Sequence, residues 1–205
     1  MYLSRVRINN NKRDTIKFLS SLQVIHAAVE GCFADDDQSR KLWRLDYLQN
    51  QPYLLLLSQE KPDFAELVKQ FGYDGDTGES RDYQGLLDSL KVGAQYRFRL
   101  CANPVVSLHV EPGKRGKVVP HVTIEYQEEW LRKRADAIGS SLDSFSVVQR
   151  GVKRFFRNGK KVTLHTADYE GILTITDADL FRKALTNGIG RAKSYGCGLL
   201  TLGRV

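Results

Sequence analysis

The stretch SFSVVQRGVKRFFRNGKKVTLHTADYEGILTI, residues 144–175, predicts two strands joined by a tight turn. Its β-branched and aromatic residues favour extended backbone, and Asn158-Gly159 is the strongest short signal for a β-hairpin. We therefore expect antiparallel strands over 144–156 and 160–175. Phe155 and Phe156 point to opposite faces of their strand, so one is expected in the core and the other in solvent.

The elements before and after this hairpin give the order of strands and helices in the second half of the chain. The second half of the chain predicts a strand over 94–110, interrupted at Asn103-Pro104, and a basic loop over 111–120. A helix over 124–139 stops at Gly139, a helix over 177–188 begins at the N-cap Asp177, and a last strand covers 197–203. The second half thus approximates β-α-β-β-α-β.

The first half predicts nearly the same order. A strand over 1–8 alternates with a period of two residues, and a helix over 13–32 carries the apolar stripe Phe18, Leu22, Ile25 and Val29. Strands over 41–48 and 52–58 form a hairpin, a helix covers 62–71, and residues 72–82 read as a loop, with no position fixed for a final strand. We expect an α+β protein of two tandem ferredoxin-like domains, residues 1–92 and 93–205, with the βαββαβ topology that RNA-recognition modules share.

The positive charge of the chain lies in its second half. Residues 1–92 carry 12 Lys/Arg and 14 Asp/Glu, a net charge of −2, whereas residues 93–205 carry 19 and 10, a net charge of +9. Such asymmetry points to a polyanionic partner, most often nucleic acid. No apolar run approaches the ~18 residues of a membrane span, and the N-terminus has no signal-peptide segment, so the cytoplasm is the expected compartment. Three scattered cysteines fit neither a disulfide framework nor a zinc site.

Two basic segments are candidates for contact with nucleic acid. Either alone is equally compatible with a solvated surface. A basic β-ribbon can enter a nucleic-acid groove or hold phosphates. The hairpin supplies Lys153, Arg154, Arg157, Lys160 and Lys161, and the loop EPGKRGK supplies Lys114, Arg115 and Lys117.

A third candidate is the glycine-rich segment GIGRAKSYGCGLLTL, residues 188–202. Glycines let the backbone approach a ligand closely, and exposed N–H groups can form an anion-binding nest. The order helix, loop, strand differs from nucleotide-binding loops, which run strand, loop, helix. A polyphosphate chain is therefore favoured over a nucleotide, and the alternative is a loop that needs glycine only for tight packing. The candidate contacts are Gly188, Gly190, Arg191, Lys193 and Gly196.

His26 is the candidate catalytic residue, because it flanks the apolar stripe of the first helix and its ring can face an interdomain surface. Histidine serves as general acid or base at neutral pH. His109, His121 and His165 read as structural or uninformative. Asp35, Asp36 and Asp37 read as solvated charges, so no metal site is predicted.

These segments together resemble the CasE family, the CRISPR repeat-RNA endoribonucleases of the type I-E Cascade complex. The resemblance covers nearly the whole chain. It rests on MYLSRVRI (1–8), LWRL (42–45), YRFRLCANP (96–104), EWLRKR (129–134), YEGILTITD (169–177) and the glycine-rich segment.

The resemblance implies two ferredoxin-like domains with RNA on a basic face. It implies metal-independent cleavage, without a cofactor, at the 3′ side of a repeat stem-loop in the CRISPR transcript, where a 2′-hydroxyl attacks the scissile phosphate. His26 matches the catalytic histidine of the family. The implied partners are the repeat RNA stem-loop and other Cascade subunits, with a monomeric free protein.

Two departures from the family pattern affect the site. Some relatives carry a tyrosine three residues before the catalytic histidine, where this chain has Gln23, which cannot transfer a proton. The second proton-transfer group therefore stays open, as does the role of His26 as base or acid. Cys101 stands where relatives usually have arginine, which removes one cation from a basic strand.

Two other functions remain open at this point. One is a non-catalytic subunit that binds an RNA hairpin, in which His26 is structural. The other is a small-molecule enzyme that holds a nucleotide phosphate with its glycine-rich loop.

Overall fold

The computed structural model describes residues 1–108, 116–157 and 159–205, so Lys114, Arg115 and Asn158 lie outside the described residues. The first half of the chain contains β1 (Tyr2–Arg7), α1 (Arg13–Ser20), α2 (Leu22–Glu30), β2 (Leu42–Leu48), β3 (Gln51–Ser58), α3 (Ala65–Phe71), β4 (Glu79–Asp82) and α4 (Gln84–Ser89). The second half contains β5 (Gln95–Ala102), β6 (Val105–Ser107), β7 (Val118–Pro120), α5 (Ile124–Arg132), the 3-10 turn η1 (Asp136–Ile138), β8 (Ser140–Arg157), β9 (Lys160–Ile175), α6 (Ala178–Asn187), the 3-10 turn η2 (Lys193–Tyr195) and β10 (Leu200–Gly203).

Each half builds one four-stranded antiparallel sheet with the same topology. The first sheet has the order β2-β3-β1-β4 and the second has the order β10-β5-β9-β8. Of the four strands in each sheet, counted in chain order, the first and third lie in the centre and the fourth lies beside the first. This is the ferredoxin-like arrangement. The predicted α+β fold with two tandem ferredoxin-like domains is confirmed.

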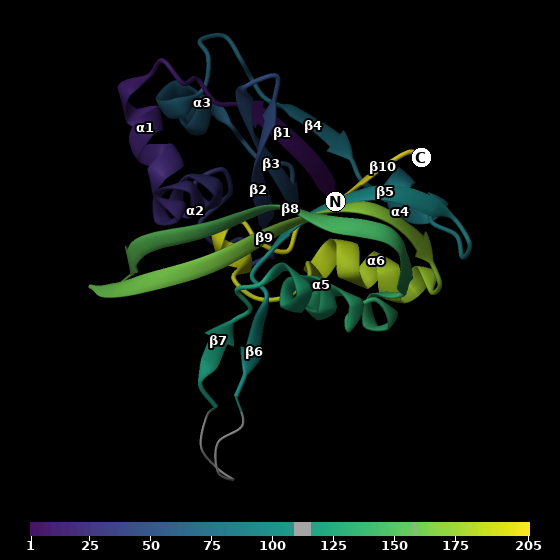
Figure 1. Ribbon diagram of the computed structural model, residues 1–205. Coiled ribbons are helices and arrows are strands. Elements are labelled where there is room, and N and C mark those ends of the chain that lie inside the picture. Colours follow the sequence, from purple (N-terminus) through teal and green to yellow (C-terminus); the bar gives the residue numbers. More distant parts are fainter. Residues whose placement is uncertain (109–115, 158) are drawn as a thin grey trace.

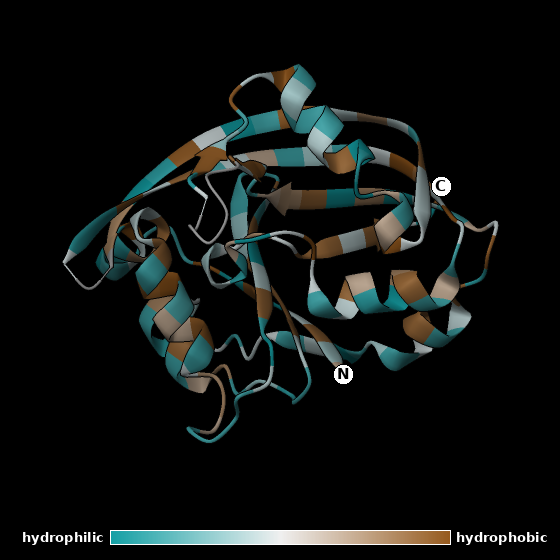
Figure 2. Cartoon of the chain, turned by 90° about the horizontal axis from the view of Figure 1, so that it is seen from below, coloured by the Kyte–Doolittle hydropathy of each residue, from teal (hydrophilic) through white to brown (hydrophobic). Residues whose placement is uncertain are grey.

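The helices lie beside the two sheets (Figure 1). The helices α1, α2 and α3 gather beside the first sheet, and α5 and α6 lie under the second. Figure 2 shows that these helices carry both hydrophobic and hydrophilic residues, as expected for helices that cover a sheet on one face only. None of the helices in the described part of the chain is long and apolar enough to cross a membrane.

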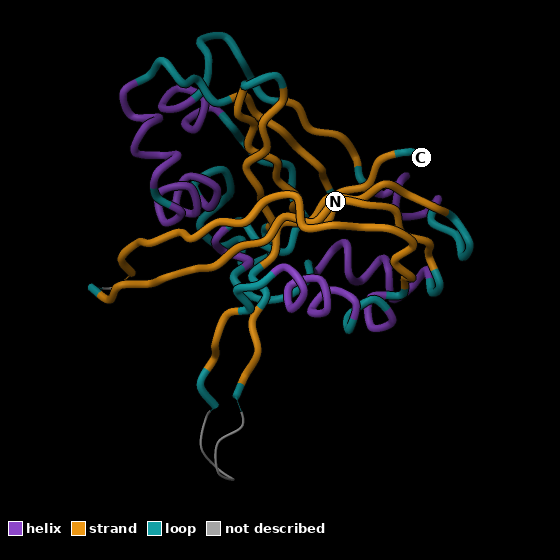
Figure 3. Tube along the Cα trace, in the orientation of Figure 1, coloured by secondary structure: helices purple, strands orange, loops and turns teal. Residues whose placement is uncertain are grey.

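Two hairpins project from this body (Figure 3). The longer one is the β8–β9 hairpin, paired from Ser140↔Ile175 to Arg157↔Lys160. The shorter one pairs β6 with β7. The predicted strands at 144–156 and 160–175 are confirmed. Phe155 is buried and Phe156 is 67% exposed, as the alternation of faces predicts.

Two of the predicted elements in the first half are wrong in detail, and one helix is additional. The helix over 13–32 is two helices, because Ser21 adopts an extended conformation (φ −129°, ψ 108°) that ends α1 and begins α2. The apolar stripe nevertheless stays continuous, with Phe18, Leu22, Ile25 and Val29 all buried. Residues 79–82 form the edge strand β4 rather than a loop, because backbone pairing with β1 holds a sequence that has no apolar alternation. Helix α4 was not predicted.

The second half differs from prediction mainly at its boundaries. The strand expected over 94–110 ends at Ala102, and the chain continues after Pro104 in a separate hairpin strand, β6. Residues 118–120 of the expected basic loop pair with β6 as β7. The helix over 124–139 ends at Arg132, and η1 follows it up to Gly139, whose left-handed φ of 71° confirms its place as the stop. Asp177 caps α6 by accepting hydrogen bonds from the backbone N–H groups of Asp179 and Leu180.

The hydrophobic core is shared between the halves. One cluster is built on Phe98, Tyr169 and Phe181 of the second half, and it also contains Leu42 and Leu57 of the first. The other cluster is built mainly on the first half, and it also contains Phe155, Leu164 and Cys197 of the second. The division at residue 92 therefore stays a prediction, since each half buries side chains of the other.

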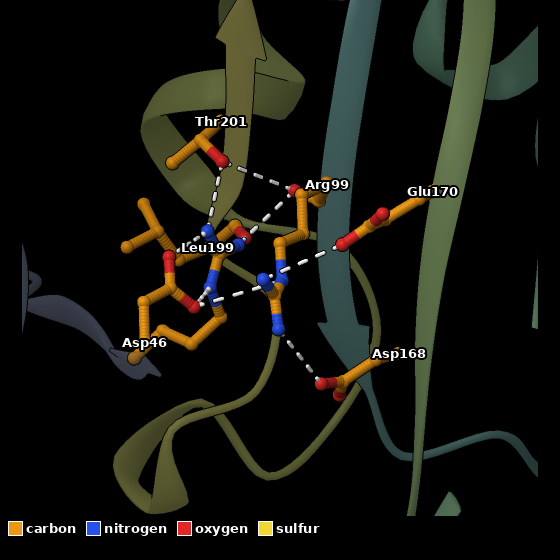
Figure 4. A network of polar contacts seen from close by, with 7 residues as sticks. Asp46, Arg99, Asp168, Glu170, Leu199 and Thr201 are labelled. Atoms are coloured by element: carbon orange, nitrogen blue, oxygen red, sulfur yellow. Dashed lines mark hydrogen bonds and ion pairs between the residues drawn. The ribbon is translucent and has the colours of Figure 1, made fainter. Parts of the chain in front are cut away.

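A buried ion network joins the two sheets (Figure 4). Arg44 on β2 donates two hydrogen bonds of 2.8 Å to the carboxylate of Asp46. Its other donors reach across to the second sheet, to the carbonyl oxygens of Leu199 (2.9 Å) and Arg99 (3.1 Å) and to the hydroxyl of Thr201 (2.8 Å). Each nitrogen of this buried guanidinium thus donates to at least one acceptor, as burial of a charge requires.

Arg99 on β5 extends the network along the second sheet. Its guanidinium lies 3.6 Å from the carboxylate of Asp46, 3.5 Å from that of Asp168 and 3.4 Å from that of Glu170. Asp46 therefore accepts hydrogen bonds from Arg44 of its own half and forms an ion pair with Arg99 of the other, and the network fixes the edge strand β2 against the second sheet.

Replacing Arg44 is expected to destabilise the protein strongly. Arg44→Met leaves the buried Asp46 carboxylate and two carbonyl groups without their donor, which costs about 3–5 kcal/mol of the free energy of unfolding. Urea denaturation measures the change. Lys69→Met is the matched control, because the exposed pair of Lys69 with Glu66 contributes no more than about 1 kcal/mol. Equal midpoints for the two variants would contradict the role of the network.

Candidate nucleic-acid interface and cleavage site

The glycine-rich loop connects α6 to β10 and lies between the two halves. Its backbone turns back on itself, since the N–H of Ile189 donates to the carbonyl oxygen of Gly198 at 3.0 Å. The N–H of Gly198 in turn donates to the carbonyl oxygen of Cys101 on β5 at 2.7 Å. These bonds fix the loop to the second sheet.

Two tryptophans, one from each half, explain two of the glycines. Gly196 has a φ of +78°, and a Cβ built on it would lie 2.8 Å from Cζ3 of Trp43 on β2. Gly190 has a φ of +81°, and its Cβ would lie 3.0 Å from two ring atoms of Trp130 on α5. Glycine is therefore required at both positions by conformation and by close packing. Tight packing, the alternative considered from the sequence, accounts for these two positions.

The residues of the loop differ in their exposure to solvent. Gly190 and Arg191 are exposed, Gly188 and Lys193 are half-buried, and Gly196 is buried. Burial lowers the pKa of Lys193, and the positive charge of Arg40 lowers it further. The exposed part of the loop that offers charge to a ligand is therefore Arg191. The predicted RNA contacts of the loop stay predictions.

His26 lies on α2, and its side chain is 34% exposed. Its Nδ1 atom is buried without a hydrogen-bond partner, 3.6 Å from a carboxylate oxygen of Glu30. The accessible side of the ring is therefore the one that carries Nε2. A histidine with one nitrogen next to a carboxylate and the other accessible can exchange a proton with a bound substrate.

Glu30 is itself held by a buried cation. Its second carboxylate oxygen lies 3.2 Å from Nζ of Lys41, whose side chain is 3% exposed. Lys41 also pairs with Asp37 at 3.4 Å. Asp37 thus belongs to a pair with Lys41 and is not the freely solvated charge that the sequence suggested. Among the described residues, no group of three or more His, Cys, Asp and Glu side chains is placed to hold a metal ion.

Tyr195 of the glycine-rich loop lies beside His26. The two rings meet edge to face, with centroids 6.4 Å apart and an interplanar angle of 68°. Helix α2 and the turn η2 are in contact, which brings Tyr195 to this position. The sequence analysis missed Tyr195, because its place depends on how the loop folds against the other half. The one available signal was an aromatic residue next to the glycines.

The basic hairpin reaches the same region. Phe155 of β8 packs on Tyr195 with ring centroids 4.7 Å apart. The cations Lys153, Arg154, Lys160 and Lys161 are exposed on the hairpin, and Arg157 is the last residue of β8. Lys117, next to β7, is exposed as well. The structure therefore brings the hairpin and the glycine-rich loop together beside α2.

A cavity of about 160 Å³ opens between the halves at this junction. Its walls come from α1, α2, β2, β5, β8, β9 and the loop. They include aromatic, cationic and apolar side chains, among them Trp43, Tyr47, Arg99, Lys153 and Tyr195. Such a mixture of stacking surfaces and positive charge suits a nucleotide strand. Arg99 and Tyr47 are further residues that the sequence analysis did not identify.

Substitution of Gly196 tests the packing of the loop. Gly196→Ala places a methyl group against Trp43 in a left-handed conformation, so we expect a loss of unfolding free energy from both causes. Gly75→Ala is the matched control, because Gly75 has a φ of +81° with nothing within 4 Å of its added Cβ. The difference between the variants in urea denaturation should be about 1–3 kcal/mol, the usual cost of overpacking. No difference would mean that the contact with Trp43 is not tight.

Comparison with known proteins gives one consistent result. The sequence model of the family described as CRISPR associated protein matches residues 1–204. The Cascade subunit CasE of Escherichia coli strain K12 is 35% identical over 121 residues, which cover 55% of this chain and 60% of that protein. The CRISPR-associated endoribonuclease Cse3 of Thermus thermophilus is 26% identical over 222 residues, which cover 98% of this chain and 99% of that protein.

The fold agrees with a solved structure of the same group. A structure of the CRISPR endoribonuclease Cse3 bound to a 19-nucleotide RNA superposes with a TM-score of 0.84, at 24% identity and with 98% of each chain covered. The resemblance to the CasE family that the sequence motifs suggest is confirmed. The chain belongs to the CRISPR associated protein family, together with CasE and Cse3.

Proposed function

We propose that this protein is an endoribonuclease that processes CRISPR precursor transcripts. It cleaves at the 3′ side of the repeat stem-loop and stays on the product as a subunit of a Cascade complex, together with other Cascade subunits. The observation that carries the proposal is the position of His26: its Nδ1 is buried 3.6 Å from Glu30, Nε2 is on the accessible side of the ring, and Tyr195 and the basic hairpin lie next to it. Family membership supports it, since one relative is named an endoribonuclease and another a Cascade subunit.

The proposed reaction needs only side chains and the RNA itself. The 2′-hydroxyl next to the scissile phosphate attacks phosphorus, the bond from phosphorus to the 5′-oxygen breaks, and a cyclic phosphate and a 5′-hydroxyl result. One proton leaves the 2′-oxygen and one is delivered to the 5′-oxygen. The extra charge on the phosphorane is stabilised by cations. No metal ion or cofactor takes part in this scheme.

His26 performs one of the two proton transfers. Gln23, exposed on α2, cannot perform the other, whereas the phenol of Tyr195 can. We assign Tyr195 as the candidate second group because its ring faces His26. The cations Lys153, Arg154, Arg157, Lys160 and Lys161 hold the stem, with Lys114, Arg115 and Lys117 as further contacts. The loop residues Arg191 and Lys193 contact the RNA beside the cleavage point rather than the stem.

His26→Ala is expected to slow cleavage at saturating enzyme by about 100-fold or more, because a general acid or base is lost. Affinity for the repeat RNA should stay at the parent value. His121→Ala is the matched control, a histidine that precedes α5 and stacks on Tyr126, and should cleave at the parent rate. Tyr195→Phe keeps the ring contacts with His26 and Phe155 and removes only the hydroxyl, so slower cleavage supports its role.

The substrate provides an independent test. RNA that lacks the 2′-hydroxyl at the scissile position should bind normally and resist cleavage, and added chelator should leave the parent rate unchanged. If His26→Ala cleaves as fast as the parent while folded, the assignment of His26 is wrong. If no repeat RNA is cleaved but the RNA binds, the protein is the non-catalytic hairpin-binding subunit.

Neutralising the hairpin tests the RNA-binding face. Lys160→Gln and Lys161→Gln should each weaken binding of the repeat stem-loop. Each should also reduce the slope of log affinity against log salt by about 0.7–0.9, the value for one phosphate contact. Lys69→Gln, an exposed lysine on α3, is the matched control. Unchanged affinity and slope for both hairpin variants would remove the hairpin from the interface.

A further inference from the structure

A second cavity involves the start of the glycine-rich loop and shares no lining residue with the first. It has a volume of about 210 Å³ and is lined by residues of β6, α5, the loop and the segments that follow β5 and α5. The polar and aromatic lining residues are Asn103, Ser107, Trp130, Arg134 and Arg191, with Gly190 at the edge. Neither the cleavage scheme nor the basic hairpin uses this cavity.

Arg134 is fixed in this cavity by Trp130. Its Nη1 donates to the carbonyl oxygen of Trp130 at 2.7 Å, and its guanidinium carbon lies 4.0 Å from the centroid of the Trp130 ring. Stacking and the hydrogen bond together hold the guanidinium in one orientation. Gly190 also packs closely against the ring of Trp130. The same side chain therefore positions both Arg134 and the loop.

Arg191 supplies a second guanidinium to the same cavity. Its Nη2 lies 3.4 Å from the hydroxyl oxygen of Ser107 on β6. Burial lowers the pKa of Arg134, and the positive charge of Arg191 lowers it further. The two cations therefore repel each other across the cavity.

No carboxylate in the described part of the chain pairs with either guanidinium to compensate this repulsion. Among the described residues, neither Arg134 nor Arg191 forms an ion pair, whereas the neighbouring Arg132 and Lys133 pair with Glu128 and Glu129. Two converging guanidinium groups without a counter-ion are unfavourable in the free protein and favourable around an anion.

We propose that Arg134 and Arg191 together bind one backbone phosphate of the RNA strand that flanks the cleavage point. A phosphodiester has two non-bridging oxygens, so each guanidinium can donate to one of them. Arg191 precedes Tyr195 by four residues, which limits the separation of their Cα atoms to about 14 Å. A strand whose scissile phosphate lies at His26 can therefore reach this pair with a few unpaired nucleotides.

This inference rests on the proposed function, because it assumes that RNA passes His26. It adds a contact to the single strand, at a cavity that no residue of the stem-binding hairpin lines. An acidic protein segment is the competing occupant, and the experiment below separates the two.

The experiment measures affinity over a range of salt concentrations for two RNAs: the repeat stem-loop with both single-stranded flanks, and the stem-loop alone. Arg134→Gln and Arg191→Gln should each weaken binding of the flanked RNA about tenfold, as the loss of a charge-assisted hydrogen bond implies. Each should also lower its salt slope by about 0.7. Binding of the bare stem-loop should not change. Lys133→Gln, one residue from Arg134 and paired with Glu129, should behave as the parent with both RNAs.

A neutral methylphosphonate placed at one flanking linkage at a time locates the phosphate. At one linkage the methylphosphonate should weaken binding of the RNA to the parent protein. The same RNA should bind the Arg134→Gln/Arg191→Gln double variant as tightly as unmodified RNA does. The exposed side chain of Arg191 is not needed for folding. If Arg191→Gln binds the flanked RNA with the affinity and salt slope of the parent, the proposal is overturned and an acidic protein segment is left as the occupant. Equal losses with both RNAs would also overturn it. Cleavage by the parent and its loss in His26→Ala test the proposed function separately.

Discussion

The contact on which the rest of the site depends is the close packing of the glycine-rich loop between Trp43 and Trp130. Each tryptophan comes from a different half, so the loop has one possible place when both are in position. That place sets Tyr195 beside His26 at one end of the loop and Arg191 beside Arg134 at the other. A single segment of irregular backbone thus belongs to both the proposed reaction site and the proposed anion site.

The interface between the halves combines two kinds of interaction with different roles. The shared apolar clusters provide most of the driving force for association, because burial of apolar surface is the dominant favourable term. The network around Arg44 adds direction, since its hydrogen bonds to Arg99, Leu199 and Thr201 form only at one relative position of the sheets. The geometry around His26, which is assembled from both halves, depends on that position.

The sequence predicted the elements with a strong local pattern. It missed the elements and side-chain positions that depend on contacts with distant segments of the chain. The β8–β9 hairpin follows from its composition and its Asn-Gly turn, and the stripe of α1 and α2 follows from its period. The break at Ser21 does not, because no glycine or proline marks it. Strand β4 has a polar sequence and exists through its backbone pairing with β1. His26 was identified on its helix, whereas Tyr195 and Arg134 become functional candidates only when distant segments meet.

The bond between Arg44 and Leu199 spans 155 residues of sequence, and this separation affects the order of events during synthesis. Domains generally fold from the N-terminus as they leave the ribosome. Here the first sheet emerges with the guanidinium of Arg44 lacking its partners from the second sheet, and with Trp43 uncovered by Gly196. Both wait until the segment from Gly196 to Thr201 has been translated. The first half therefore keeps an unfinished surface on the ribosome until that segment covers it.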